Sequence, residues 1–215
     1  MGLAALRVGH RVIGTGRDIR NATLENLEFE RLGGEWLQLD VSNPDAQGTV
    51  EQLFRREEDS LKNNERVHWV VVNNADKPLW VHSSMESHTA CSTSPPPSTL
   101  ISISSIWGFV SKPEHMMYSA AKAITESLTE SYASLLAPFG IRTMIVEPGG
   151  FKTKFPSRNT KADGGITKDY EERIKAWMNI VDTAGMNETM VGGDPKLFGA
   201  RILDAVEGAG LFKDI

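Results

Sequence analysis

Three side chains in the middle of the chain have types that could act together in proton transfer. Tyr118 and Lys122 are four positions apart, so a helix would place them on one face, a turn from each other. Ser105 precedes them, at the end of an apolar run, Leu100 to Ile103, that stops at Ser104-Ser105. A tyrosine phenol titrates near ~10, and a neighbouring lysine ammonium would lower that pKa by about 1–3 units. The phenol could then pass a proton to or from a carbonyl or alcohol oxygen.

A serine hydroxyl beside the same oxygen could donate a hydrogen bond and hold it in place. The three groups therefore suit the interconversion of a carbonyl and an alcohol, provided that another group supplies the hydride. Their positions depend on a strand ending at Ser104-Ser105, a helix carrying Tyr118 and Lys122, and a second strand, Ile141 to Val146. Ligands of open parallel sheets bind at the carboxyl ends of strands, where Ser105 would lie.

These residues resemble the short-chain dehydrogenase/reductase family, over roughly Gly2 to Leu211. The segment from Tyr118 to Phe155 is most similar to the branch of 17β-hydroxysteroid and retinol dehydrogenases. The matching motifs are Asn73-Asn74-Ala75, Ser105, Tyr118-Ser-Ala-Ala-Lys122 and Pro148-Gly149-Gly150-Phe151-Lys152-Thr153. The resemblance implies an oxidoreductase acting on CH–OH groups of a small lipophilic substrate. Tyr118 would be the proton donor, Lys122 would assist it and hold the nicotinamide ribose, and Ser105 would orient the carbonyl.

The expected cofactor is NADP(H), because an arginine at the end of the second strand of a dinucleotide fold accommodates the 2′-phosphate. Arg17 holds that place in this chain, although it could equally be a solvated loop arginine. The resemblance also implies cofactor contacts from Asp40, Asn74, Phe151 and Thr153, besides Tyr118 and Lys122. Asp76 stands where the family normally has a glycine after the Asn-Asn-Ala motif.

Alternating strand and helix patterns with near-continuous apolar strands predict an α/β fold with a Rossmann-like, doubly wound parallel sheet. The sequence predicts further strands at 10–14, 36–39 and 68–72, and helices at 2–8, 24–32, 45–62, 168–180 and from Asp194-Pro195 to about 206. We expect one domain, residues 1–215, with an irregular replacement at 77–98 and a substrate-covering region at 154–194.

The helix that carries Tyr118 also has an apolar set that predicts a core face, made of Ala120, Ala121, Ala123, Ile124, Leu128 and Leu135. In the resembling family this helix also packs against its mate, so a homodimer through it is a candidate assembly.

Two parts that the resemblance implies have no counterpart in the sequence. The first strand with its glycine-rich turn would precede Gly2, and Gly14-Thr-Gly16 does not replace it because Ile19 holds the third glycine position. The crossover helix with the family's catalytic asparagine would fall within 77–98. We therefore expect an incomplete, truncated fold. Two hypotheses follow. In the first, the sequence is an incomplete reading of an NADP(H)-dependent reductase; in the second, it is a non-catalytic remnant that binds at most a protein partner.

The bulk composition narrows the class of protein further. The 215 residues carry a net charge of −5 without a basic block, which argues against nucleic acid as a partner. The single cysteine, Cys91, excludes an internal disulfide and fits a reducing compartment. No signal peptide and no apolar run of about 20 residues is evident, so we expect a cytoplasmic protein without a membrane span. His82, His88 and Cys91 lack a fourth ligand at suitable spacing, so no metal site is expected.

Overall fold

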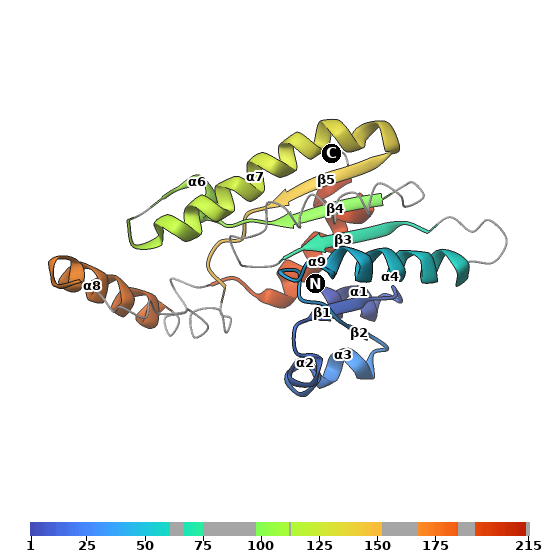
Figure 1. The fold of residues 1–215 in the computed structure, drawn as a ribbon, viewed down its shortest axis with the longest axis horizontal. Coiled ribbons are helices and arrows are strands. Elements are labelled where there is room, and N and C mark those ends of the chain that lie inside the picture. Colours follow the sequence, from blue (N-terminus) through green and yellow to red (C-terminus); the bar gives the residue numbers. More distant parts are fainter. Residues whose placement is uncertain (61–66, 75–97, 112, 152–166, 185–191, 214–215) are drawn as a thin grey trace.

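The computed structural model describes residues 1–60, 67–74, 98–111, 113–151, 167–184 and 192–213. Within them every strand pairing is parallel, and the strands form two sheets (Figure 1). One sheet pairs β1 (Ile13–Gly16) with β2 (Glu35–Gln38). The other has the order β3-β4-β5, from Trp69–Asn73, Ser98–Ile103 and Ile141–Val146. The predicted parallel α/β fold class is confirmed.

The central strand, β4, carries the core of the larger sheet. All six of its residues are buried, and Leu100 and Ile101 are 1% and 0% exposed. On one face Leu100 packs with Leu136 and Ile141, and on the other Ile101 packs with Ile202. A parallel strand covered on both faces needs this near-continuous apolar sequence.

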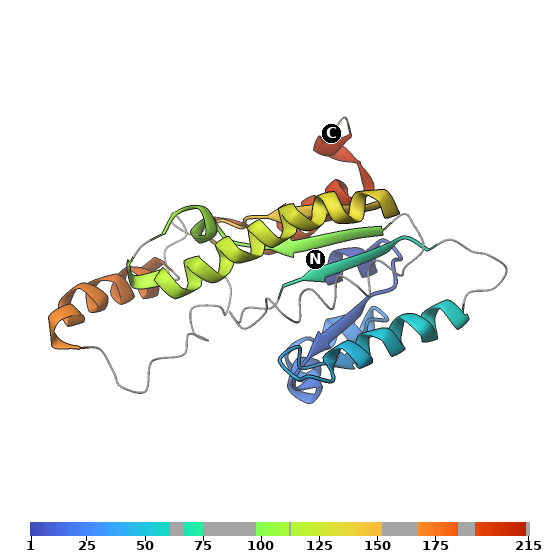
Figure 2. The same cartoon turned by 45° about the horizontal axis from the view of Figure 1, so that its top comes forward.

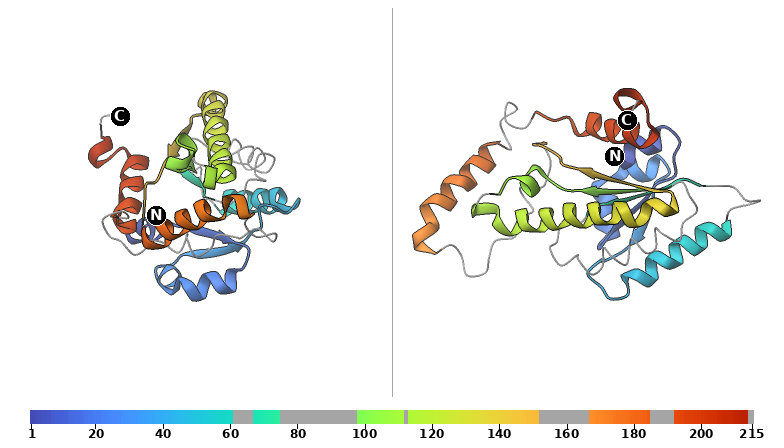
Figure 3. Two further views of the ribbon diagram at one scale, coloured as in Figure 1. Left: turned by 90° about the vertical axis from the view of Figure 1, so that its left-hand side faces the viewer. Right: turned by 90° about the horizontal axis from the view of Figure 1, so that it is seen from above.

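Helices cover both faces of the three-stranded sheet (Figures 2 and 3). α7 (Met116–Leu136) runs along one face and packs through Leu136 on the Leu100 cluster. α9 (Pro195–Glu207) lies on the opposite face and packs through Ile202, with Met1 beside it. α4 (Ala46–Ser60) reaches β3 through Phe54, whose ring meets Trp69 edge-on at 4.9 Å.

The remaining helices are short or lie outside the sheet layers. These are α1 (Gly2–Arg7), α2 (Ile19–Glu25), α3 (Leu27–Arg31), α6 (Ile106–Phe109), η1 (Pro113–His115), η2 (Ala137–Phe139), α8 (Lys168–Ala184) and η4 (Gly210–Phe212). None of the helices in the described part of the chain is both long and apolar enough to cross a membrane.

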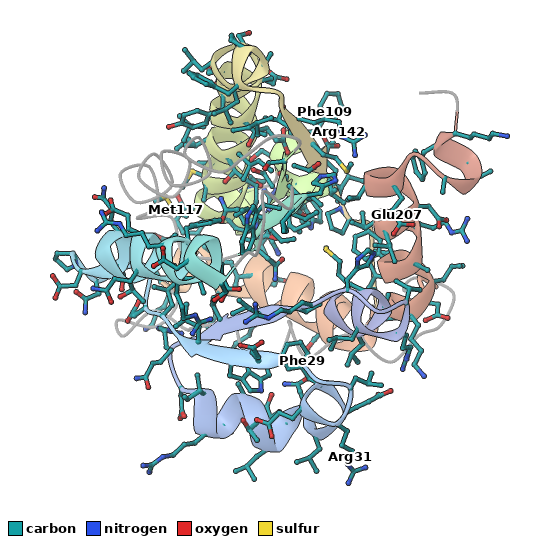
Figure 4. The ribbon with its side chains drawn as sticks, turned by 90° about the vertical axis from the view of Figure 1, so that its right-hand side faces the viewer. Phe29, Arg31, Phe109, Met117, Arg142 and Glu207 are labelled. Carbon is teal, nitrogen blue, oxygen red and sulfur yellow. The ribbon has the colours of Figure 1, made fainter. Side chains whose placement is uncertain are left out.

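Phe29 of α3 supports the smaller sheet. Its ring packs against Trp36 of β2 at 4.5 Å between centroids, and Figure 4 shows it beneath β1 and β2. A Cβ on Gly34 would lie 2.5 Å from the Phe29 ring, and a Cβ on Gly14 would lie 2.7 Å from the Trp36 ring. Both positions therefore require glycine for this packing.

An ion-pair cluster ties the smaller sheet to α4. Arg11 donates to the Glu35 carboxylate at 2.7 and 3.1 Å, and it also bonds Glu57, which is only 6% exposed. Arg56 pairs with the same Glu57 at 2.7 Å. The hydrogen bond from Arg11 lowers the pKa of Glu35 below its usual value, and raises the pKa of Arg11 itself.

Two elements differ from the prediction, one in where it begins and the other in being divided into two helices. The strand predicted at 10–14 starts only at Ile13, because the backbone N–H of His10 still bonds Ala5 of α1 and Gly9 turns the chain with φ +92°. The helix predicted at 24–32 is two helices that meet at Asn26, whose backbone leaves the helical region at φ −135°, ψ 51°. The first of them starts at Ile19, after Asp18 caps the N–H of Asn21.

The prediction of an apolar core face on α7 is wrong for Ala120, Ala123, Ile124 and Leu135, which are all exposed, Ile124 and Leu135 by 45% and 63%. The buried α7 residues are Ser119, Lys122, Thr129 and Leu136. Three of these four are polar, so apolar spacing pointed to the other side of the helix. Its inward face is polar because several of its side chains bond the end of β4.

The replacement segment expected at 77–98 lies outside the described residues, apart from Ser98, which begins β4. Within the region 154–194, the structure describes α8 and residues 192–194. The expected loss of a first strand and a crossover helix stays a prediction.

Candidate active site

Ser105 lies where β4 passes into α6. It is the N-cap of α6, with an extended backbone, and its Oγ accepts a hydrogen bond from the N–H of Trp107 at 3.3 Å. The preceding residue is fixed to β5, because the N–H of Ser104 donates to the carbonyl of Val146 at 2.7 Å. Ser105 is only 8% exposed and lies two residues beyond the carboxyl end of β4.

α7 places Tyr118 and Lys122 beside this strand end. Lys122 is 5% exposed, and its Nζ donates to the carbonyl oxygen of Ile103 at 3.0 Å. The same Nζ lies 5.6 Å from the centroid of the Tyr118 ring. The lysine ammonium is thus close to both the end of β4 and the tyrosine ring, and the spacing on one helix face predicts its contact with the tyrosine.

Two aromatic residues from the segment between Ser105 and Tyr118 pack in a row that ends at Tyr118. The Trp107 indole stacks on the His115 imidazole with centroids 5.1 Å apart and planes at 24°. His115 in turn meets Tyr118 edge-on, at 6.4 Å and 81°. Neither residue could be predicted from the sequence, because their contact depends on how α6 turns back on α7.

Glu126 is a further residue near this group that was not predicted from the sequence. The hydroxyl of Ser104 donates to its carboxylate, next to the candidate serine. A sequence signal exists, because Tyr118, Lys122 and Glu126 recur at four-residue intervals and so follow one face of α7. The signal is weak, since Glu is common in helices.

The predicted cofactor residues at the smaller sheet lie together. Arg17 and Asp40 follow β1 and β2, whose last residues, Gly16 and Gln38, are register partners. Arg17 is exposed, and Asp40 accepts from the N–H and hydroxyl of Ser42 at 3.0 and 2.6 Å. An exposed cation and a nearby carboxylate at one sheet edge suit a phosphate and hydroxyl groups respectively.

The remaining predicted residues fall at the ends of β3 and β5. Asn74 is exposed directly after β3. Phe151, after β5, bridges to Gly193, and its ring packs on Phe198 at 4.8 Å. Thr153 lies outside the described residues. So do His82, His88 and Cys91, and the part of the chain that is described contains no group of three potential metal ligands.

Comparison with known proteins identifies the family. The sequence model of the short chain dehydrogenases matches residues 82–164. The oxidoreductase claN of Passalora fulva is 30% identical over 177 residues, which cover 72% of this chain and 77% of that protein. The 3-ketodihydrosphingosine reductase of Bacteroides thetaiotaomicron is 33% identical over 108 residues, 50% of this chain and 39% of that protein. A short-chain dehydrogenase from Streptomyces avermitilis superimposes with a TM-score of 0.67 at 25% identity, covering 96% of this chain and 78% of that one.

The chain belongs to the short-chain dehydrogenase family, and it is an oxidoreductase of the type that acts on CH–OH groups. The family implies a nicotinamide cofactor, NAD or NADP, and a small-molecule substrate. The donor set fits such a group in two places: a buried ammonium beside a tyrosine at Lys122, and the cation and carboxylate at Arg17 and Asp40. The resemblance on which the sequence analysis relied is confirmed at the level of the family.

Proposed function

We propose that this chain interconverts a carbonyl and an alcohol on a small lipophilic substrate with NADP(H), using Ser105, Tyr118 and Lys122. One observation carries the proposal. The buried Lys122 ammonium is bonded to the end of β4 at Ile103 and lies 5.6 Å from the Tyr118 ring centroid, while Ser105 lies two residues beyond that strand end, as the N-cap of α6. This arrangement supports a shared site in which a proton donor, a cation and a hydroxyl donor act on one carbonyl oxygen.

In the direction of reduction, Tyr118 donates its phenolic proton to the carbonyl oxygen as that oxygen gains charge. Lys122 stabilises the phenolate that remains, because an ammonium nearby favours the charged form. The Ser105 hydroxyl donates to the same oxygen and orients the carbonyl. When bound, the nicotinamide cofactor supplies the hydride. Lys122 would also hold the ribose, and Arg17, Asp40, Asn74, Phe151 and Thr153 would bind the rest of the cofactor.

The preference for NADP(H) rests on Arg17, an exposed cation at the end of β1. The lipophilic substrate is supported by α6, where Ile106, Phe109 and the adjoining Val110 are 50%, 83% and 45% exposed, directly after Ser105. The relative named a 3-ketodihydrosphingosine reductase acts, by that name, on a lipid ketone.

The test is a reductase assay with the purified full chain. Decanal, cyclohexanone and 9-fluorenone would be offered with NADPH or NADH, and cofactor oxidation followed by absorbance. We expect turnover with NADPH, and a loss of about 10²–10⁴-fold in Tyr118→Phe. Tyr132→Phe is the matched control, since Tyr132 packs against the Leu100 cluster near the opposite end of α7 from Tyr118. Unchanged turnover in Tyr118→Phe would refute the assignment, and no turnover with any pair would favour the non-catalytic remnant.

Three broader proposals accompany this one. We take residues 1–215 as one domain, in which 154–194 covers the substrate. The single cysteine supports a cytoplasmic location. The exposed Ile124 and Leu135 on α7 support a homodimer through that helix, because large apolar side chains exposed on one helix are candidates for an interface.

A further inference from the structure

The inward face of α7 holds three consecutive residues at the end of β4. The Thr129 and Ser102 hydroxyls form a hydrogen bond of 2.8 Å, the Lys122 ammonium donates to the Ile103 carbonyl at 3.0 Å, and the Ser104 hydroxyl donates to the Glu126 carboxylate. These contacts stop at the residue before Ser105. The last of these contacts, between Ser104 and Glu126, therefore fixes the residue to which Ser105 is joined.

Ser104 is fixed from two sides. Its N–H bonds Val146 of β5 at 2.7 Å, and its hydroxyl bonds Glu126 of α7. Ser104 is 3% exposed, so these bonds are shielded from water. Ser105 shares a peptide bond with Ser104, and its own backbone is extended at φ −162°, ψ 155°. A shift of the Ser104 side chain would pass directly to Ser105.

Gly108 of α6 leaves room for the hydrogen-bonded pair of Ser104 and Glu126. A Cβ on Gly108 would collide with the Glu126 carboxylate and lie 2.9 Å from the Ser104 Oγ. The turn that passes over the pair is held by Ser105, whose carbonyl accepts from the Gly108 N–H at 2.8 Å. The absence of a side chain at Gly108 thus lets the carboxylate lie under the turn that Ser105 caps.

We propose that Glu126 is a positioning residue for Ser105, acting through its hydrogen bond to the Ser104 hydroxyl. This role rests on the proposed function of Ser105 in orienting the carbonyl. Glu126 touches neither substrate nor cofactor in the proposal. Its effect comes from fixing the strand end, since a misplacement of about 1 Å in a reacting group can cost on the order of 10²-fold in rate.

Three substitutions remove or disturb the bond in different ways. Glu126→Ala deletes the acceptor, Ser104→Ala deletes the donor, and Gly108→Ala pushes a methyl group against the carboxylate. With the carbonyl compound that the protein reduces fastest, each should lower kcat by about 10–100-fold and leave the cofactor KM within about twofold. Glu126→Gln keeps an acceptor oxygen and should retain most of the turnover. Glu130→Ala, on an exposed position one turn along α7, is the control and should match the unaltered protein.

A double-mutant cycle distinguishes positioning from a general loss of structure. If Glu126 acts through Ser105, Glu126→Ala should have almost no further effect on kcat in a Ser105→Ala background. Equal effects in both backgrounds, or full turnover in Glu126→Ala, would overturn the proposal. Thermal unfolding of each variant identifies any that fails to fold, in which case Ser104→Ala supplies the same cycle without removing a charge.

The failure of the proposed function gives a different result. Full turnover in Ser105→Ala and Tyr118→Phe, or none in the unaltered protein, would refute the role of Ser105 and the positioning role with it. Low turnover in Ser105→Ala together with additive losses from Glu126→Ala would refute the positioning role alone.

Discussion

The ammonium of Lys122 and the carbonyl oxygen of Ile103 form a buried hydrogen bond of 3.0 Å that ties α7 to the last residue of β4. The bond gives Lys122 a structural task besides its proposed part in proton transfer. The two tasks can be separated by experiment, because stability and turnover report on them independently.

Lys122→Met should lower the free energy of unfolding by about 1–3 kcal/mol, since the Ile103 carbonyl loses its donor in a buried place. Turnover should fall as well, because methionine carries no charge beside Tyr118. Lys122→Arg keeps a charged donor and should be more stable than Lys122→Met, although the planar guanidinium fits the site of the ammonium less well. Urea unfolding measures the difference. Equal stability of Lys122→Met and the unaltered protein would show that the bond contributes nothing.

Thr129→Val should destabilise the protein by about 1–2 kcal/mol without lowering turnover per folded molecule. Valine keeps the shape but removes the bond to the Ser102 hydroxyl, and both residues are almost fully buried, at 2% and 1% exposed. Thr125→Val is the matched control. Its hydroxyl donates to the carbonyl of Ala121 in its own helix, so we expect a smaller change in urea unfolding. A larger effect for Thr125→Val would contradict the prediction.

Two glycine-to-alanine changes should have opposite signs. Gly208 ends α9 in the left-handed region, at φ +63°, where a Cβ costs roughly 1 kcal/mol. Gly48 lies within α4 with open space around its Cα, so alanine should stabilise that helix by about 0.5–1 kcal/mol. Denaturant unfolding of both variants checks the signs. Stabilisation by Gly208→Ala would contradict the cap geometry.

The Arg11–Glu35 pair should make stability depend on pH on the acid side. The hydrogen bond and charge of Arg11, with Arg56 nearby, lower the pKa of Glu35 in the folded state below the usual 4.5. The unfolded chain therefore takes up its proton first, so the stabilisation is present above about pH 4.5 and declines as the pH falls through the folded value. Glu35→Gln should flatten this decline, and Glu130→Gln should not. The difference should shrink in high salt, because Glu35 is 44% exposed.

The proposed homodimer gives a test of the exposed apolar side chains on α7. Ile124→Glu and Leu135→Glu should each shift the sedimentation coefficient of a dimer toward that of a monomer, because a carboxylate at the centre of an apolar interface is costly to desolvate. Leu24→Glu, at a 73% exposed position on α2, is the control. Unchanged sedimentation of both α7 variants would rule out this interface.

Several elements could be predicted because their signals are local. The apolar run Ile141–Val146 is bounded by Gly140 and Glu147-Pro148, and it forms β5 with those limits. Asp194 and Pro195 start α9 as predicted, with the Asp194 side chain accepting from the Lys196 N–H, and Gly208 ends it. Capping depends on a few neighbouring residues, so sequence alone reveals it.

The inward face of α7 could not be predicted in the same way. Hydrophobic spacing points to Ile124 and Leu135, but the sheet is met by Lys122 and Thr129, whose polar atoms bond the strand. A buried polar group is recognisable only when its partner is known, and the partners are residues 19 and 27 positions away. Glu126 could not be predicted for the same reason, because its partner Ser104 lies 22 positions earlier. The motif residues were predicted because their types and order match a known family.

Because the strands form two separate sheets, we expect the two sheets to open independently of each other. β1 and β2 have four residues each and pair with one another, with Phe29 on Trp36 as their apolar support. β4 is covered on both faces, and local opening is rarer where burial is greater. Backbone amides of the small sheet should therefore exchange with solvent through partial openings that leave β4 closed. The proposed cofactor residues Arg17 and Asp40, which follow the strands of that sheet, would then open more often than Ser105, so a bound cofactor could leave without disturbing the proposed proton-transfer groups.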